Sequence, residues 1–413
     1  MAGSTADNLI GKWERLHRLG YERQLLGEWD AARNYYEQAL IAKPGYAASQ
    51  LALAQLRMMQ SGFREGRELY EMRFAAWERA DDTADWRGLP FARWQGEPLK
   101  GKHLHLWAEQ GFGDVIMVAG FLPYFLAQEP SRITLSMFPK MISLFARSFP
   151  QVVVESLQDI GAYALSPTIL DSFPQLLNMV QATGMQIDLE PMRQDYDRAL
   201  SRGKPDYCAP MGDLMVYGLP DFVPSQHPLY MVADPVRVAE TKNRLQRFGA
   251  GYRIGISWHT ANKESGSVRS IPLPELLPLL HMPECRFFSL QHHVSLAEIE
   301  SFCGENGCRI QADMPDVVQD TEGLAALTAS MDEIITIDNS NVHLAGALGV
   351  PATLLLPKGY DFRWPVLHGD HDTLWYKSVS VKRQEEAFNW CGVIEKVTME
   401  LENRLKQRQQ YGG

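Results

Sequence analysis

The feature that most constrains the fold is an alternation of short apolar runs with helical segments, which occurs twice along the chain. The first series opens with a strand expected at 103–108 and a helix at 115–128, and the second opens with a strand expected at 252–258. Such alternation is typical of a parallel sheet covered by its connecting helices. We therefore expect two doubly wound α/β domains that face each other across a cleft, with ligands beyond the carboxyl ends of the strands.

The remaining elements follow from the same periodicity. In the first series we expect strands at 132–137 and 152–155 and helices at 139–148 and 172–183. In the second we expect strands at 285–291, 333–337 and 352–356, helices at 273–280, 296–303, 324–330 and 341–348, and a last helix at 390–407. Proline and glycine become frequent between about 203 and 235, which predicts an interdomain linker there.

The N-terminal part repeats itself with a constant offset of 34 residues. Leu19-Gly20, Trp29, Ala32 and Tyr36 of the first copy align with Leu53-Ala54, Phe63, Gly66 and Tyr70 of the second. Small residues allow antiparallel helices to approach, and aromatic residues fill the gap to the next pair, as in tetratricopeptide repeats. Two repeats are fewer than the roughly three that a free-standing solenoid needs. The helices are therefore expected to lean on the following domain or on another subunit of a homo-oligomer.

These patterns divide the chain into five parts. They are tetratricopeptide-like repeats at 8–76, a connector at 77–101, Rossmann-like domains at 102–235 and 236–390, and a C-terminal helix and tail at 391–413. The fold class is thus α/β with an all-α N-terminal part.

Composition narrows the class of protein further. The 413 residues include 40 basic and 50 acidic side chains, and a net charge of −10 provides no overall field that attracts nucleic acid. The five cysteines are scattered without metal-site spacing, so we expect reduced thiols and no metal. The start of the chain lacks a signal-peptide pattern, and the longest apolar stretch, 115–127, contains Pro123 and is shorter than the roughly 20 residues of a membrane span. We expect a cytoplasmic protein without a transmembrane segment.

A glycine-bearing turn follows the first strand of the first series. It consists of Glu109, Gln110, Gly111, Phe112, Gly113 and Asp114. Glycines permit close backbone approach, and the start of the following helix favours an anion. Asp114 is then either the N-cap of that helix or a carboxylate that acts as a general base.

A polar loop follows the strand at 252–258. Its candidate ligand-binding residues are His259, Thr260, Asn262, Lys263, Arg269 and Ser270. A cationic, hydroxyl-rich loop at the carboxyl end of a strand suits a diphosphate. The alternative is an ordinary solvated surface loop.

The strand at 333–337 leads into Asp338, Asn339 and Ser340, which can cap the small-residue helix that follows. The unpaired N–H groups of that first turn can bind phosphate. His343 lies in the same turn and is expected to face the start of the helix.

Several motifs occur in one order at plausible spacing: AEQGFGDVI, GISWHTANKESGSVRSIPL, FSLQ, the DT of QDTEGLAAL, IDNSNVHLAGALGVP and DFRW…LWY. Together, over about residues 13–400, they resemble tetratricopeptide-repeat proteins whose C-terminal part is a GT-B glycosyltransferase related to the bacterial heptosyltransferases of glycosyltransferase family 9. The resemblance implies a GT-B fold of two facing Rossmann-like domains. It also implies a metal-independent reaction, with a nucleotide sugar as co-substrate and no other cofactor.

The resemblance assigns roles to single residues. Asp114 matches a proposed catalytic base, Lys263 and Arg269 match the loop that contacts the donor diphosphate, and Asp338 and His343 match the family's Asp-Thr-x-x-x-His pattern. Asn339 stands where that pattern has Thr, and Gly120 where relatives often have Arg. Further candidates in the cleft are Gln291, Asp320 and Thr321, for the base or ribose, and Trp364.

The function expected from the resemblance is sugar transfer to a protein such as flagellin or to a saccharide. The repeats would present the protein or peptide acceptor. Two alternatives stay open: a non-catalytic interaction scaffold that retains a degenerate GT-B fold, and another GT-B enzyme such as a nucleotide-sugar epimerase or hydrolase. The donor base and sugar, and retention or inversion at the sugar, are left open.

Overall fold

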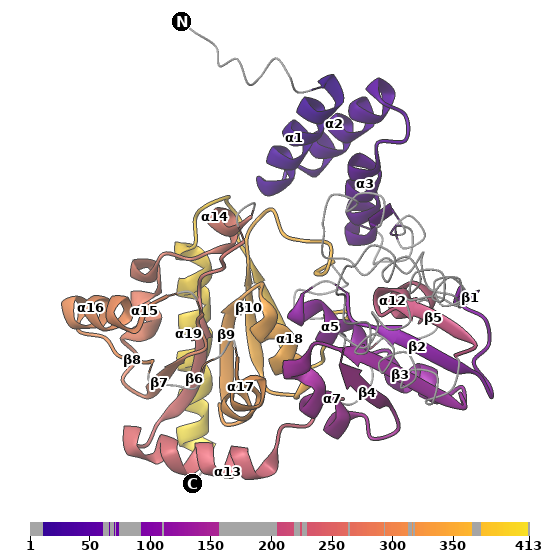
Figure 1. Cartoon of the computed structure of the whole chain (residues 1–413). Helices are drawn as coiled ribbons and strands as arrows, with labels where there is room; N and C mark the ends of the chain where they lie inside the picture. The colour runs from indigo at the N-terminus through magenta and orange to yellow at the C-terminus, as the bar shows by residue number, and fades with distance from the viewer. Residues whose placement is uncertain are drawn as a thin grey trace, which may run out of the picture. The chain divides into compact units, whose positions relative to one another are not determined.

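The structure is a computed structural model that describes residues 11–60, 66, 70, 72–73, 92–109, 111–156, 205–218, 224, 229–262, 265–292, 294–312, 316, 319–365 and 373–411. The chain forms two compact units, each with its own parallel sheet (Figure 1). Unit 1 comprises residues 1–79, 223–229 and 233–413, and unit 2 comprises residues 80–222 and 230–232. The helix expected at 172–183 lies outside the described residues.

Unit 2 contains a five-stranded parallel sheet in the order β1-β5-β2-β3-β4. Its strands are β1 (Ala92–Arg93), β2 (His103–Trp107), β3 (Arg132–Met137), β4 (Val153–Ser156) and β5 (Tyr207–Pro210). Its described helices are α5 (Phe112–Ala119), α6 (Leu122–Leu126), α7 (Ile142–Ser148) and α12 (Gly212–Gly218), with a short 3-10 turn η3 (Pro139–Met141).

Two predictions in unit 2 are wrong. The predicted linker at 203–235 contains β5, which lies between β1 and β2 in the sheet, because a four-residue strand that ends in proline gives no recognisable period. The single helix predicted at 115–128 is two helices, α5 and α6, which meet at Gly120 and Phe121. Pro123, near the start of α6, has no N–H to continue the hydrogen bonds of α5.

Unit 1 contains a six-stranded parallel sheet in the order β11-β10-β9-β6-β7-β8. Its strands are β6 (Tyr252–Ser257), β7 (Cys285–Ser289), β8 (Ile310–Gln311), β9 (Glu333–Ile337), β10 (Ala352–Leu356) and β11 (Val379–Arg383). The helices around it are α13 (Pro235–Leu245), η6 (Gln246–Phe248), α14 (Gly266–Arg269), η7 (Leu273–Leu276), α15 (Leu277–Leu280), α16 (Leu296–Asn306), α17 (Thr321–Thr328), α18 (Ser340–Ala347) and α19 (Cys391–Tyr411).

The expectation that 352–356 is the last strand of this sheet is wrong, because β11 pairs with β10 along its whole length. The strand was not predicted from its sequence, VSVKR, because the lysine in it is typical of a surface segment. Lys382 is in fact buried, and its Nζ lies 2.7 Å from the carboxylate of Glu400 in α19. A buried lysine that is paired in this way cannot be distinguished from a surface lysine by composition alone.

The long C-terminal helix α19 covers one face of this sheet, and Figure 1 shows it alongside β6 and β9. Ile394 and Leu401 of α19 share a core cluster with Ile335 and Ile337 of β9. The helix is also held by charge, since Glu333 of β9 is buried and bonds Arg404, with Oε2 and Nη2 2.8 Å apart.

The N-terminal helices α1 (Lys12–Leu25), α2 (Trp29–Ala42) and α3 (Ala47–Gln60) belong to unit 1. Gly20 of α1 lies against the buried ring of Tyr36, as expected for the first repeat, and the Tyr36 hydroxyl donates to Gln24 at 2.8 Å. Most of the second helix of the second copy lies outside the described residues, so the repeat assignment stays a prediction. These helices were expected to lean on the following domain or on another subunit, and that expectation stays a prediction. In the structure they contact residues 358–362 of the C-terminal part.

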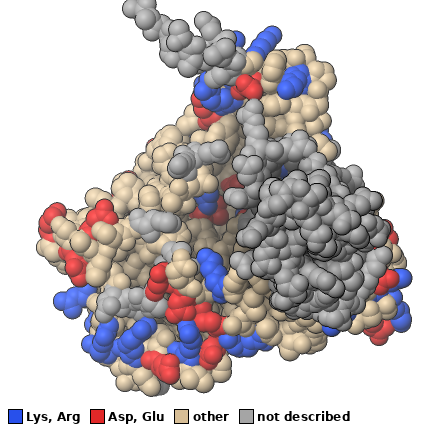
Figure 2. Space-filling view, in the orientation of Figure 1, with Lys and Arg blue, Asp and Glu red and all other residues tan. Residues whose placement is uncertain are grey.

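Among the helices that the structure describes, none combines the length and the apolar character that a membrane span requires. On the face shown in Figure 2, the described basic and acidic side chains are interspersed around the segment that contains α13.

Candidate functional site

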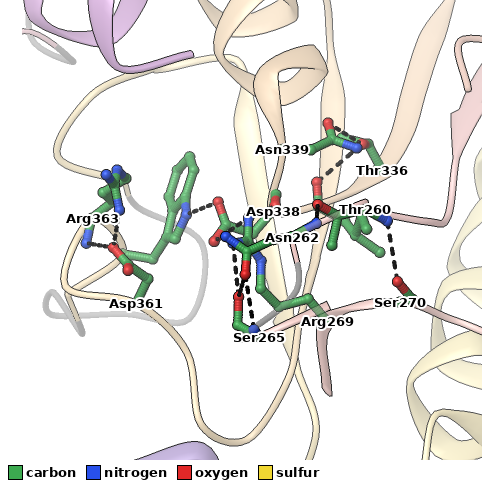
Figure 3. Close-up of polar contacts among 12 residues, drawn as sticks. Thr260, Asn262, Ser265, Arg269, Ser270, Thr336, Asp338, Asn339, Asp361 and Arg363 are labelled. Atoms are coloured by element: carbon green, nitrogen blue, oxygen red, sulfur yellow. Dashed lines mark hydrogen bonds and ion pairs between the residues drawn. The ribbon is translucent and has the colours of Figure 1, made fainter. Parts of the chain in front are cut away.

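The candidate site lies in unit 1, at the carboxyl ends of β6 and β9. These strands are neighbours in the sheet, with Ser257 opposite Thr336, although almost 80 residues separate them in the chain. Their ends bring the loop that carries Arg269 next to the turn that carries Asp338, as Figure 3 shows. The sequence predicted both segments as phosphate-binding elements, and the sheet places them together.

The ion pair between Arg269 and Asp338 is the centre of the site. Arg269 Nη2 lies 3.2 Å from Asp338 Oδ2 and also donates to the backbone carbonyl of Asp338. Asp338 is 4% exposed, and burial by itself would raise its pKa. The charges of Arg269 and Arg363 and the hydrogen bond from Trp364 outweigh burial, so the pKa of Asp338 lies below its ordinary value and the carboxylate is ionised.

Trp364 holds the second oxygen of Asp338. Its indole N–H donates to Oδ1 at 2.8 Å, and its ring stacks on His343, with centroids 5.3 Å apart and planes at 22°. His343 is buried, and its Nδ1 lies 2.9 Å from the hydroxyl of Tyr376. The imidazole expected to face the start of the helix is therefore packed between two aromatic side chains.

Gly346 makes that packing possible. A Cβ at this position would overlap the ring of Tyr376, so any larger residue in α18 would displace the tyrosine from His343. The ring of Tyr376 is therefore the neighbour that requires a small residue at this position of the helix.

Asn339 is the N-cap of α18. Its Oδ1 accepts the N–H of Asn341 at 2.9 Å, and its Nδ2 donates to Ser257 of β6 at 3.0 Å. Ser257 Oγ in turn lies 2.5 Å from Thr336 Oγ1, so the cap also ties β6 to β9. Asn339, which stands where the pattern that the sequence resembles has threonine, thus caps the helix.

The loop after β6 is held by its own hydroxyl groups. Ser270 Oγ accepts the N–H of Thr260 at 3.1 Å and lies 3.3 Å from His259 Nδ1. Asn262 Oδ1 accepts the N–H of Ser265 at 2.9 Å, and the Ser265 hydroxyl accepts from Arg269 Nη1 at 3.3 Å. These contacts fix the direction of the Arg269 side chain (Figure 3).

Of the further candidates in the cleft, Gln291 and Asp320 bond to backbone groups, and Thr321 is buried. The buried amide of Gln291 accepts the N–H groups of Trp258 and His259 and donates to the carbonyls of His259 and His292. Asp320 caps α17 through the N–H of Gly323, at 2.9 Å, and pairs with Arg237 at 2.7 Å. Thr321 is buried in the first turn of α17.

The candidates around Asp114 belong to unit 2. The helix begins at Phe112 with Gly111 as N-cap, so Asp114 is the third helical residue and not the N-cap considered from the sequence. Its Oδ2 accepts the N–H of Gly111 at 3.3 Å, and the side chain is half-buried. Glu109 accepts the N–H of Gly212 at the start of α12, at 3.0 Å, and Gly113 lies in the first turn of α5.

Gly120, the other departure from the family pattern, is buried directly after α5. Gln110 and Lys263 lie outside the described residues. Within the described part of the chain, no group of three or more His, Cys, Asp or Glu side chains could hold a metal ion.

Sequence reasoning missed three residues of the site. Arg363 adds positive charge near Asp338, Ser265 orients Arg269, and Tyr376 fixes His343. Arg363 and Tyr376 stand in or beside the DFRW…LWY motifs, which were the only signal for them.

Donor groups at this edge are suited to an anion. Arg269 Nε is buried and has no hydrogen-bond partner among the described residues. The half-buried hydroxyl of Ser340 likewise has none in the part of the chain that is described. The start of a helix also leaves backbone N–H groups without intrahelical partners. In α18 the N–H of Asn341 donates to Asn339 Oδ1.

No known family model matches this chain. It is similar to protein FlbA of Caulobacter vibrioides, with 30% identity over 402 residues that make up 93% of this chain, and it spans 60% of the length of that relative.

Two solved structures are also similar. The glycosyl transferase family 9 structure from Veillonella parvula is 14% identical with a TM-score of 0.44, covering 70% of this chain and 88% of that one. The ADP-heptose lps heptosyltransferase II of E. coli is 13% identical with a TM-score of 0.45, covering 74% of this chain and 99% of that one.

Proposed function

We propose that this protein is a glycosyltransferase that takes a sugar from a nucleoside-diphosphate donor, with the diphosphate bound at the carboxyl ends of β6 and β9. The proposal is supported by the ordered motifs and by the juxtaposition of Arg269, Asp338 and the start of α18.

One observation carries the proposal: Arg269 and Asp338 come from distant segments and form a fixed ion pair beside a helix start, with the Arg269 Nε–H left without a partner among the described residues. When the bond between the sugar and the diphosphate breaks, negative charge grows on the departing phosphate oxygens. Oriented guanidinium, hydroxyl and backbone N–H donors stabilise that charge without having to reorganise. In this proposal Asp338 keeps Arg269 in place and does not itself transfer a proton.

The acceptor side of the reaction is assigned to unit 2. Asp114 would accept the proton of the acceptor hydroxyl or amine as the new glycosidic bond forms. The acceptor would be a protein or peptide held by the N-terminal helices, or a saccharide, and the reaction would take place in the cytoplasm.

The test is a binding screen with ADP, GDP, UDP, CDP and dTDP against the intact chain. A bound ligand at 100 times its Kd raises the unfolding free energy by about 2.7 kcal/mol, which a thermal shift detects. We expect one of these nucleotides to bind, and Arg269→Ala to weaken that binding by about tenfold or more, as calorimetry would show.

Two further variants separate binding from folding. Ser340→Ala leaves the Arg269–Asp338 pair intact and should still weaken binding. Arg244→Ala, on the exposed side of α13, removes the same charge elsewhere and should not. If no nucleotide binds, or if Arg269→Ala binds as well as the wild type, the proposal is wrong. A non-catalytic interaction scaffold would then be the better explanation of the protein's function.

A further inference from the structure

The segment 357–364 joins the N-terminal helices to the candidate site. It follows β10 and ends at Trp364, whose indole holds Asp338. Its residues before Trp364 contact α1, α2 and Tyr70 of the second repeat copy. This segment of eight residues therefore contacts both the N-terminal helices and the candidate site.

The contacts to the helices leave little space. A Cβ at Gly359 would overlap the carbonyl oxygens of Gln24 and Leu25 at the end of α1. A Cβ at Gly27 would lie 2.7 Å from the side chain of Lys358, and Gly27 has a φ of +72°, which favours glycine. Backbone here lies directly on backbone, so neither partner can shift without moving the other.

Aromatic contacts extend this junction along the segment. The ring of Tyr360 lies 5.2 Å from the ring of Trp29, the first residue of α2, at 64°. The ring of Phe362 lies 5.6 Å from that of Tyr70, and both side chains are buried. Edge and tilted arrangements of this kind fix orientation as well as bury apolar surface.

The other end of the segment is equally constrained. Arg363 pairs with Asp361 at 2.6 Å, and its carbonyl accepts the indole N–H of Trp375. Arg383 donates to the carbonyl of Trp364 at 3.3 Å and lies over the ring of Tyr360, 4.9 Å from its centroid. The position of Tyr360 is thereby coupled to that of Trp364.

We infer that Trp29 and Tyr360 are positioning residues for the nucleotide site, acting through Trp364 on Asp338 and hence on Arg269. This inference rests on the proposed function for the ligand of that site. A change in the N-terminal helices would alter the affinity for the nucleoside diphosphate. By linkage, if an acceptor bound to those helices changes the affinity for the nucleotide, the nucleotide changes the affinity for the acceptor by the same factor.

The experiment compares Trp29→Ala, Trp29→Phe and Ile41→Ala in the intact chain. Ile41 also lies in α2 but is 81% exposed, so its truncation is the matched control. Amide hydrogen exchange of peptides covering 338–343 and 357–365 is measured first, without nucleotide. We expect exchange in both peptides to rise about threefold or more in Trp29→Ala, and to stay near the wild-type rate in Trp29→Phe and Ile41→Ala.

Nucleotide affinity is the second readout. The Kd of whichever nucleoside diphosphate binds the wild type should rise about threefold to tenfold in Trp29→Ala, with Trp29→Phe restoring most of the affinity. Phe362→Leu keeps an apolar side chain but removes the ring contact with Tyr70, and it should weaken binding in the same direction even if Trp29→Ala folds poorly.

The two readouts separate failure of this inference from failure of the proposed function. If no nucleoside diphosphate binds the wild type, the proposed function fails. Amide hydrogen exchange alone then tests whether the N-terminal helices are coupled to the site. Unchanged exchange at 338–343 and 357–365 in Trp29→Ala overturns the inference. An unchanged Kd in both Trp29→Ala and Phe362→Leu also overturns it when the wild type binds.

Discussion

Asp338 in unit 1 and Asp114 in unit 2 both follow a buried central strand, and their surroundings differ. Asp338 is 4% exposed, and its two oxygens are held by Arg269 and Trp364. Asp114 is half-buried in the first turn of α5, and its bond to the N–H of Gly111 is 3.3 Å long.

The difference suggests that two carboxylates in similar sequence positions have different roles, one in orienting Arg269 and one as the proposed general base. A carboxylate that is buried and bonded on both oxygens orients its partners and keeps its charge. In the proposed function, a half-buried carboxylate in the first turn of a helix can be approached by an acceptor hydroxyl or amine. Five variants and one pH titration test this contrast and the capping of the helix beside Asp338.

The largest effect is expected for Asp114→Asn. Loss of a general base lowers kcat by about 10²- to 10⁴-fold, because the acceptor proton then has no side chain to receive it. The variant should unfold at nearly the wild-type denaturant concentration, since asparagine can still accept the Gly111 N–H. Transfer with the donor found in the binding screen measures kcat. Activity within a few-fold of the wild type would show that Asp114 is not the base.

Asp338→Ala should have the largest effect on stability. It leaves Arg269 without the carboxylate that pairs with it, at a cost of about 3–5 kcal/mol. Asp338→Asn keeps the shape and one acceptor oxygen, so it should lose less. Urea unfolding monitored for each unit, for example by exchange, measures both. Equal stability of Asp338→Ala and wild type would contradict the buried-pair description.

Acidification should remove part of the same stability. Because the pKa of Asp338 is lower in the folded chain, its carboxylate stabilises the fold above the ordinary aspartate pKa of about 4. That contribution is lost as the pH falls from about 4 through the lowered folded value. The difference in unfolding free energy between wild type and Asp338→Asn should therefore be constant at neutral pH and shrink on acidification. A difference that grew on acidification would contradict the sign of the shift.

The smallest effects are expected at the cap of α18. Asn339→Ala removes the acceptor for the N–H of Asn341 and the contact with Ser257, and should cost about 1 kcal/mol. Asn339→Thr introduces another capping residue and should change stability by only about a few tenths of a kcal/mol. A thermal shift of both variants checks this order. If Asn339→Thr were the more destabilising, capping would not explain the asparagine.

Much of the sheet architecture could be predicted because buried parallel strands are continuous apolar runs. The predicted bounds of β3, β9 and β10 agree with the structure. The strands β5 and β11 were missed for opposite reasons. One is four residues long in a segment rich in proline and glycine, and the other carries a buried lysine.

The site was predictable only in pieces. Arg269 and Asp338 could be named because polar residues at strand ends are conspicuous, but their contact depends on β6 and β9 being neighbours, which is a property of the topology. The contacts of Trp364 and Tyr376 with His343 likewise depend on the tertiary structure and cannot be predicted from the sequence alone. Gln291 shows that a polar side chain after a strand can also have a structural contact, because its amide oxygen accepts the N–H groups of Trp258 and His259.

The measurement that tests the central claim most directly is hydrogen exchange of the intact chain with and without the nucleoside diphosphate that binds it. The account predicts that the nucleotide slows exchange in peptides covering 259–270 and 338–343, and leaves α13 unchanged. Protection confined to other segments, with none at the ends of β6 and β9, would contradict it.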